Sequence, residues 1–153
     1  SAGEVTATAD TAGIAAADVE RVAQTFVGDI LQVPPMVSAI KKDGRPLYKL
    51  ARKGKTVERE ARPVTIHYLK LSRIAVPDVD LEVSCSKGTY VRTLCADMGR
   101  KLGCGAHLLS LRRLRSGRFD VAQAYPVDAI KQWERPDLFA HMISLPEVLR
   151  HLS

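Results

Sequence analysis

The sequence feature that most constrains the fold is a change of hydrophobic period between residues 79 and 102. Apolar and polar residues alternate through 79–86, which is the two-residue period of a strand with one buried face. Beyond the turn signal Lys87-Gly88-Thr89, apolar residues recur at helical spacing until Gly103. The apolar face of this helix comprises Val91, Leu94, Cys95, Met98 and Leu102. A strand that leads directly into an amphipathic helix predicts a mixed fold.

The neighbouring patterns extend this prediction to a whole domain. Residues 63–74 have the pattern of a strand, which we expect to pair antiparallel with residues 79–86. Apolar spacing predicts a helix over 15–27, with Gly28 at its C-cap. The expected fold class is α+β, with a mixed, mainly antiparallel sheet, flanking helices and a single domain over 1–153.

The C-terminal third carries weaker signals. Residues 108–119 predict a strand pair that turns around Ser116-Gly117. Two short helices are expected after it, one following Pro126 and one opening at Ser144, where Glu147 has capping-box spacing. Trp133 and His141 are interpreted as packing or surface residues.

Charge is distributed unevenly along the chain, although its net value is only +6. Residues 41–73 contain eleven Lys and Arg against three Asp and Glu, and residues 85–118 contain eight against one. These two stretches together carry +15, and the rest of the chain carries −9. A strongly basic middle between acidic flanks predicts a surface that binds a polyanion.

The basic segment 32–62 has the composition of a loop or hairpin that projects from the domain. It contains a Pro-Pro pair, a Lys-Lys-Asp-Gly turn signal and a short helix expected to start at Pro46 and stop at Gly54. So much charge on so short a helix leaves little apolar face for packing. Cations around an aromatic residue, Tyr48, favour single-stranded or irregular RNA over duplex DNA as the ligand.

The strand-to-helix junction CSKGTYVRTL is a candidate anion site. Gly88 lets the backbone approach a ligand closely, and Tyr90 and Arg92 stand beside the free N–H groups of a helix start. Such a corner suits a phosphate or a carboxylate that must stay ionised. The alternative is an ordinary helix start with solvated basic residues.

The segment LRRLRSGR, residues 111–118, carries four arginines in eight positions. If it is a strand, Leu111, Arg113 and Arg115 share one face. Arginine binds phosphate with two parallel hydrogen bonds and stacks on bases, which fits a nucleic-acid groove. A solvated strand edge fits the same pattern equally well.

The cysteines give no indication of a disulfide framework or a metal site. Cys85, Cys95 and Cys104 form no CxxC pair, and neither a signal peptide nor a long apolar run precedes them. We therefore expect a reducing, cytoplasmic setting and no membrane association. Cys104 and His107 are three apart, but Cys85 and Cys95 lie on apolar faces, which argues against zinc.

Two long motifs closely resemble the tRNA pseudouridine synthase B family, whose eukaryotic relatives include dyskerin. They are QVPPMVSAIKKDGRPLYKLARKGKTVEREARPV at 32–64 and CSKGTYVRTLCADMGRKLGCGAHLLSLRRLRSGRF at 85–119. The motifs stand in the family's order, and the resemblance covers about residues 15–130. It implies an enzyme that isomerises a T-loop uridine of tRNA to pseudouridine without metal or organic cofactor, after the base is flipped out of the folded loop.

The resemblance also implies roles for individual residues. Arg92 looks like the arginine that pairs with the family's nucleophilic Asp, Tyr90 would lie in the same pocket, and Leu111 looks like the residue against which the base packs. An ion pair with Arg92 would orient that carboxylate and keep it ionised. Residues 32–62 resemble the family's RNA-gripping thumb. The residues expected to bind the T stem-loop are Lys87, Lys41, Lys42, Arg45, Tyr48, Arg52, Arg112 and Arg113.

The family's nucleophilic Asp belongs to a motif of the type G-x-L-D-P-x-A-T-G, and no Asp of this chain has that context. The motif lies upstream of both matching segments in the family, as does the tyrosine that stacks on the target base. We therefore expect this chain to be part of a catalytic domain and to be inactive alone. Exposed sheet edges would lead it to associate with the missing N-terminal segment or with itself.

The alternative function is a non-catalytic RNA-binding or RNA-chaperone module built from the same motifs. A DNA-binding helix-turn-helix over 91–111 fits poorly, because its second element is strand-like and rich in Gly.

Overall fold

The computed structural model describes residues 7–38, 41–42, 45–46 and 57–150. The chain forms two compact units, residues 1–110 and 111–153, and each is described by itself. One domain over 1–153 is predicted from the sequence, and the boundary after Ser110 was not predicted. Residues 105–114 around that boundary adopt neither helix nor strand.

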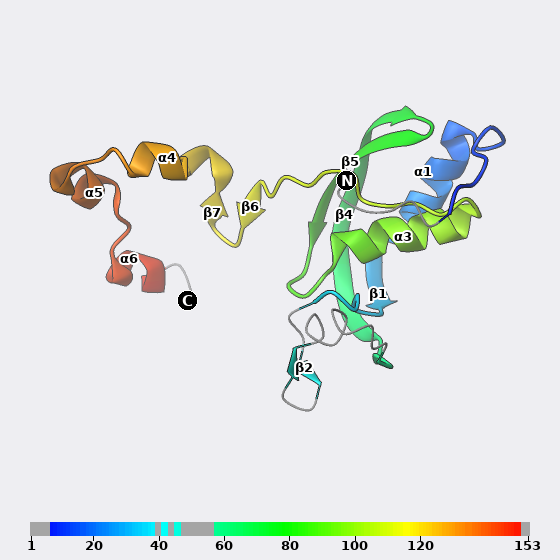
Figure 1. The fold of residues 1–153 in the computed structure, drawn as a ribbon, viewed down its shortest axis with the longest axis horizontal. Coiled ribbons are helices and arrows are strands. Elements are labelled where there is room, and N and C mark those ends of the chain that lie inside the picture. Colours follow the sequence, from blue (N-terminus) through cyan, green and yellow to red (C-terminus); the bar gives the residue numbers. More distant parts are fainter. Residues whose placement is uncertain (1–6, 39–40, 43–44, 47–56, 151–153) are drawn as a thin grey trace. The chain divides into compact units, whose positions relative to one another are not determined.

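The first unit is built on a three-stranded antiparallel sheet with the order β1-β4-β5 (Figure 1). β1 spans Gly28–Gln32, β4 spans Arg62–Ala75 and β5 spans Asp78–Cys85. The predicted antiparallel pairing of the two longer strands is confirmed, with Leu71 opposite Leu81. Their connection is shorter than expected, because only Val76 and Pro77 separate β4 from β5.

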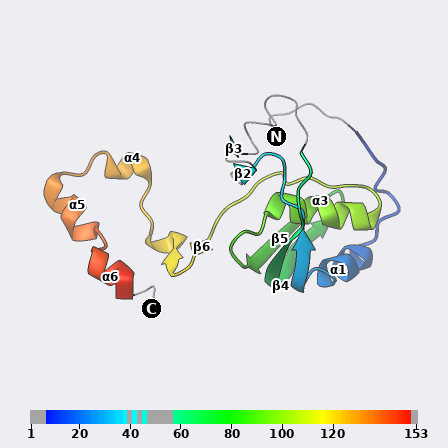
Figure 2. The ribbon, with the colours of Figure 1, turned by 90° about the horizontal axis from the view of Figure 1, so that it is seen from below.

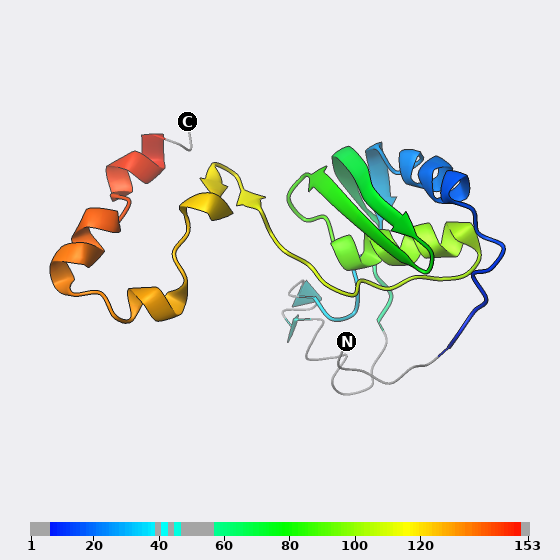
Figure 3. The ribbon, with the colours of Figure 1, turned by 90° about the horizontal axis from the view of Figure 1, so that it is seen from above.

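Two helices form the core of this unit together with the sheet. α1 spans Ala16–Gln24 and α3 spans Val91–Leu102. Figures 2 and 3 show α3 lying across the sheet and α1 at its β1 edge. The buried cluster consists of Val22 and Ala23 from α1, Ile66 and Leu69 from β4, and Leu94 and Met98 from α3. The predicted apolar face of 91–102 is therefore confirmed at its centre.

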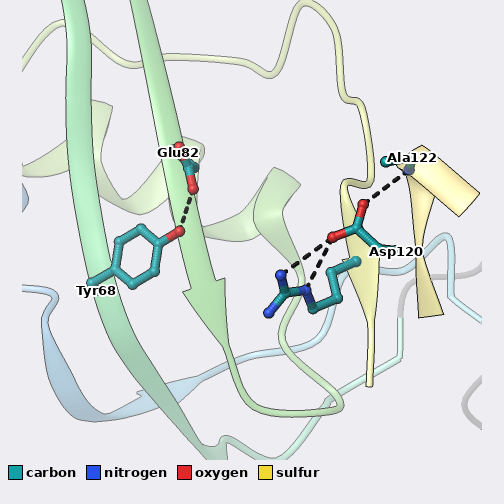
Figure 4. Close-up of polar contacts among 5 residues, drawn as sticks. Tyr68, Glu82, Asp120 and Ala122 are labelled. Carbon is teal, nitrogen blue, oxygen red and sulfur yellow. Dashed lines mark hydrogen bonds and ion pairs between the residues drawn. The ribbon is translucent and has the colours of Figure 1, made fainter. Parts of the chain in front are cut away.

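A bulge in β4 allows this strand to contribute to the core along its length. Ile66 and Leu69 are three residues apart, so a regular strand would direct them to opposite faces. The pairing with β5 shifts register between Ile66 and Tyr68, and both apolar residues are buried. Tyr68 is 44% exposed, and its hydroxyl donates a hydrogen bond to the Glu82 carboxylate on β5 (Figure 4).

The predicted end of the first helix is wrong by three residues. The C-cap is Thr25, whose hydroxyl donates to the Val22 carbonyl at 2.7 Å. The N–H groups of Thr25, Phe26 and Val27 each bond to the carbonyl three residues earlier, which tightens the last turn. Gly28 instead starts β1, with a φ of 101° that turns the chain from the helix into the strand.

The predicted hairpin within 32–62 is confirmed where the structure describes it. β2 spans Lys41–Lys42 and β3 spans Arg45–Pro46, and the two pair antiparallel. The short helix expected from Pro46 to Gly54 lies outside the described residues.

The second unit starts with a two-stranded ribbon made of β6, Arg115–Ser116, and β7, Phe119–Asp120. The predicted strand pair is thus confirmed, but residues 111–114 are not in a strand, so the predicted shared face of Leu111, Arg113 and Arg115 does not form. Asp120 accepts hydrogen bonds from the Ala122 N–H at 2.9 Å and from Arg115 at 3.2 Å (Figure 4). The hydrogen bond from the Ala122 N–H lowers the pKa of the Asp120 carboxyl below its usual range, and the bond from Arg115 makes a smaller contribution in the same direction.

Short helices follow the ribbon. They are η1 at Val121–Gln123, α4 at Val127–Ile130, α5 at Arg135–His141 and α6 at Leu145–Arg150. α4 and α6 were predicted; at the start of α6, Glu147 accepts from both the N–H and the hydroxyl of Ser144. α5 was not predicted, because its large apolar residues Leu138 and Phe139 are adjacent in sequence and do not recur at helical spacing.

The second unit packs through contacts between the side-chain rings of aromatic residues and histidine rather than around a buried core. Tyr125, Trp133 and His141 form a cluster whose ring centroids lie 4.6 to 4.9 Å apart, so the packing interpretation of Trp133 and His141 is confirmed. None of the described residues from 111 to 150 is fully buried. Nor does any helix in the described part of the chain have the length and apolar character needed to cross a membrane.

Gly99 provides a test of the packing in the first unit. Its carbonyl accepts the Gly105 N–H at 2.9 Å, and a Cβ at residue 99 would lie 2.1 Å from the Ala106 nitrogen. We expect Gly99→Ala to lower the free energy of unfolding by at least about 2 kcal/mol, because backbone atoms must move to admit the methyl group.

The matched control is Gly13→Ala, since a Cβ there meets nothing within 4 Å. We expect this variant to change stability by less than about 0.5 kcal/mol. Urea unfolding of both variants checks the prediction, and equal stability of the two would contradict the close approach of residues 105–106 to α3.

Candidate functional site

The candidate site lies in the first unit, where the end of β1, the start of β4 and the junction between β5 and α3 meet. A pocket of about 250 Å³ is found there. It is lined by Gln32, Pro34, Arg62, Pro63, Val64, Lys87, Gly88 and Tyr90. The register places Gln32 opposite Arg62 in the sheet, while Lys87, Gly88 and Tyr90 come from the junction.

The junction is held by bonds that continue the sheet beyond its last paired residue. The Ser86 N–H donates to the Thr65 carbonyl at 2.8 Å, and the Ser86 hydroxyl accepts from the Thr65 N–H at 2.9 Å. Gly88 then adopts a φ of 86°, in the left-handed region that favours glycine. The predicted turn at Lys87-Gly88-Thr89 is therefore confirmed, while the close approach of a ligand to Gly88 stays a prediction; Tyr90 follows as the extended N-cap of α3.

Gln32 fixes the backbone of Tyr90, and this role was not predicted. Its side-chain amide donates to the Tyr90 carbonyl at 3.2 Å, and its amide oxygen accepts the Tyr90 N–H at 2.7 Å. Gln32 is 2% exposed and is among the largest fully buried side chains of the described residues. The sequence does carry a weak signal for it, because Gln32 shares the strand face of the half-buried Ile30 and is polar where an apolar residue is expected.

Arg92 reaches back to the segment that follows β1. Its Nη2 donates to the Val37 carbonyl at 2.8 Å, and Arg59 Nη1 donates to the Pro34 carbonyl at 3.0 Å. Within the described ranges, Arg92 forms no ion pair with an acidic side chain. Its exposed guanidinium therefore has N–H groups available for a carboxylate or a phosphate.

The structure brings together some of the residues predicted from the sequence. Lys87, Tyr90 and Arg92 lie within six residues at one junction, and Lys87 and Tyr90 line the same pocket. Leu111 lies in the second unit and is 59% exposed. The other residues expected to bind RNA fall into three groups. Arg112 and Arg113 are exposed in the second unit, and Lys41, Lys42 and Arg45 belong to the β2–β3 hairpin. Tyr48 and Arg52 lie outside the described ranges.

Cysteine and histidine do not form a metal site in the described part of the chain. No group of three or more His, Cys, Asp or Glu there is arranged to hold an ion. Burial raises the pKa of the Cys95 thiol, which agrees with its position on the inner face of α3 and makes it a poor nucleophile at neutral pH.

Replacement of Gln32 tests whether this side chain holds the junction together. Gln32→Leu has a similar size but leaves the N–H of the half-buried Tyr90 without its partner, while the Tyr90 carbonyl still accepts the Leu94 N–H at 3.0 Å. We expect the free energy of unfolding to fall by about 1 to 3 kcal/mol. Gln24→Leu, an exposed position in α1, is the control and should have an effect below about 0.5 kcal/mol. Similar urea midpoints for the two variants would contradict the role given to Gln32.

Both parts of the chain match known family models. Residues 1–91 match the TruB family pseudouridylate synthase (N terminal domain), and residues 92–150 match the tRNA pseudouridylate synthase B C-terminal domain. The division between the two matches falls at the start of α3, next to Tyr90 and Arg92.

Similar curated proteins are longer than this chain. The chain is 50% identical over 153 residues to tRNA pseudouridine synthase B of Syntrophotalea carbinolica, covering 98% of this chain and 49% of that protein. It is 57% identical over 115 residues to tRNA pseudouridine synthase B of Pseudomonas aeruginosa, covering 75% of this chain and 38% of that protein. The chain thus spans half or less of the length of these relatives.

The fold also resembles a solved structure. A chain in the crystal structure of a Cbf5-Nop10-Gar1 complex matches with a TM-score of 0.62 and 28% sequence identity. The match covers 84% of this chain and 35% of that one. The α+β, pseudouridine synthase-like fold expected from the sequence is confirmed.

Proposed function

This chain belongs to the TruB family of pseudouridylate synthases, and from that premise we propose that it is one part of the catalytic domain of a tRNA pseudouridine synthase. The proposed substrate is the T stem-loop of tRNA, in which one uridine is isomerised to pseudouridine. The observation that carries the proposal is the junction itself, where Tyr90 and Arg92 stand together and Arg92 has no acidic partner in the described ranges.

In the proposed mechanism the nucleophile is an Asp supplied by a segment outside this chain. Its carboxylate forms a bond to the nucleotide as the bond between the base nitrogen and the ribose breaks. The uracil then rotates, and the carbon–carbon bond to the ribose forms as the bond to the carboxylate breaks, which frees the Asp. The hydrogen on the attacking base carbon leaves as a proton and the freed ring nitrogen gains one, so the reaction needs no cofactor. Arg92 orients the carboxylate and keeps it ionised at neutral pH.

The other proposed site residues bind and position the RNA. Tyr90 lies near the flipped base, and Leu111 packs against it. The T arm is held by Lys87, Arg112, Arg113 and the thumb over residues 32–62. This agrees with the net charge of +15 that the two basic stretches carry together. The proposed location is the cytoplasm, where tRNA is modified in bacteria. The two edge strands of the sheet, β1 and β5, are the proposed places at which the remainder of the catalytic domain pairs.

The test of this proposal is a tritium-release assay on T-arm RNA labelled at the uracil carbon that loses its hydrogen. We expect no turnover by this chain alone, and turnover by the full-length product of the source gene under the same conditions. Robust turnover by the chain alone would contradict the proposal, because the chain would then contain its own nucleophile. A source gene without an Asp motif upstream of Ser1 would favour a non-catalytic RNA-binding or RNA-chaperone module.

A further inference from the structure

The groups that line the pocket at the junction select for an anion. Gln32 uses both ends of its amide on Tyr90, and the same two bonds occupy the N–H and carbonyl of Tyr90. Pro34 and Pro63 have no N–H, and the Pro34 carbonyl already accepts from Arg59. The charged side chains that line the pocket are Arg62 and Lys87, and no acidic side chain lines it.

Some cations of the first unit form ion pairs with a carboxylate, and others do not. Away from the pocket, Arg21, Arg73 and Arg100 each form an ion pair with an Asp, at Asp18, Asp80 and Asp97 respectively. Around the pocket, neither Arg62 nor Lys87 pairs with a carboxylate in the described part of the chain. Lys70 and Lys101 are likewise without an ion pair in the described part of the chain, so the pocket is what distinguishes Arg62 and Lys87.

The pocket has room for a charged group. Its volume of about 250 Å³ is below the range of about 300 to 1,000 Å³ found for pockets that enclose a whole small molecule, and it is large enough to admit a phosphate group. Arg62 belongs to β4 and Lys87 to the junction, so two cations from separate elements converge on one small space. A phosphate group, with negative charge and several acceptor oxygens, matches the charge of these two side chains.

We propose that this pocket binds one phosphate of the RNA backbone through Arg62 and Lys87, beside the junction that carries Tyr90 and Arg92. The proposal rests on the proposed function, because it takes the phosphate from an RNA substrate. It adds Arg62, which the sequence motifs did not single out, and it identifies a phosphate contact next to the site at which the base is expected to react. Such a contact would fix the register of the RNA without reading its sequence.

The experiment measures binding of the chain to a T stem-loop RNA by fluorescence anisotropy between 50 and 200 mM KCl. Arg62→Gln and Lys87→Gln are each expected to reduce the magnitude of the log–log salt slope by about 0.7 to 0.9, because one phosphate contact is lost. Affinity at 100 mM KCl should fall about 5- to 8-fold for each variant, by the same salt relation extrapolated to 1 M. The control is Arg21→Gln, which removes an equal charge from an exposed position of α1 outside the pocket and outside both basic stretches, and we expect it to leave the slope unchanged.

The possible outcomes separate this inference from the proposed function. A steep slope for the wild-type chain that Arg62→Gln and Lys87→Gln leave intact would overturn the phosphate pocket and leave RNA as the partner. A flat wild-type slope would overturn the proposed function itself. If a variant fails to fold, the wild-type chain decides the question by amide NMR, where added T stem-loop should shift the Gly88 resonance more than that of Gly13. An unmoved Gly88 resonance in the presence of bound RNA would overturn the pocket.

Discussion

Arg92→Lys in the full-length enzyme is expected to reduce kcat on the order of 100- to 1,000-fold, while T-arm affinity changes by less than about threefold. Lysine keeps the positive charge that attracts the RNA backbone. It cannot hold a carboxylate with two parallel hydrogen bonds, so the nucleophile would lose its orientation. A charge-preserving change should therefore separate catalysis from binding at this residue.

The structure explains why this residue can perform two tasks at once. One of the five N–H groups of the Arg92 guanidinium donates to the Val37 carbonyl, which ties the side chain to the segment after β1. The remaining donors are available for the carboxylate that the rest of the enzyme is proposed to supply. The ammonium group of lysine is a single point, so one variant would disturb both contacts.

The measurement compares single-turnover rates with the dissociation constant for the same T-arm RNA. Arg100→Lys is the matched control, because Arg100 lies on the same helix and pairs with Asp97 at 2.9 Å. It should leave the rate and the affinity within about twofold of the wild type, as expected for an exposed ion pair. Equal losses of rate and affinity in Arg92→Lys would show that Arg92 is only a phosphate contact.

Elements with a strong hydrophobic period were predicted correctly from the sequence. The β4–β5 pair and α3 appear where residues 63–102 predict them, because the alternation in the strands and the helical spacing that follows each direct one face toward the same core. Gly103 ends α3 with a φ of 86°, as a left-handed C-cap requires. The strand-to-helix junction could be located for the same reason.

Features that depend on tertiary contacts could not be predicted. The bulge at residue 67 follows from pairing with β5, and the clamp of Gln32 on Tyr90 joins residues 58 positions apart. The α1 C-cap was misplaced because Gly28 serves the following strand rather than the helix. None of the described residues of the second unit is buried, so its segments have no apolar face that packs into a core. Residues 111–114 and α5 therefore show no hydrophobic period from which a strand, a helix or a loop could be predicted.

The candidate site was only partly visible in the sequence. The motif resemblance pointed to Lys87, Tyr90 and Arg92, and these do meet at one junction. Arg62 stood in a basic stretch without a feature to distinguish it from its neighbours. Its proposed role depends on the pocket that it shares with Lys87, which is visible only in three dimensions.

Raising KCl from 50 to 200 mM is expected to weaken binding of this chain to a T stem-loop about 130- to 500-fold. The physical reason is counterion release, since each phosphate that a cation neutralises frees a condensed ion from the RNA. About five such contacts give a log–log slope of roughly −3.5 to −4.5. Five contacts require only a minority of the nineteen Lys and Arg in the two basic stretches, residues 41–73 and 85–118.

The salt titration of T stem-loop binding by the wild-type chain is the most direct test of the claim that these basic stretches form an RNA-binding surface. It needs neither the nucleophile nor turnover, so it reports on the residues that this chain contains. The account predicts a straight log–log plot with a slope between about −3.5 and −4.5. A slope near zero, with affinity unchanged from 50 to 200 mM KCl, would contradict it and remove RNA as the partner.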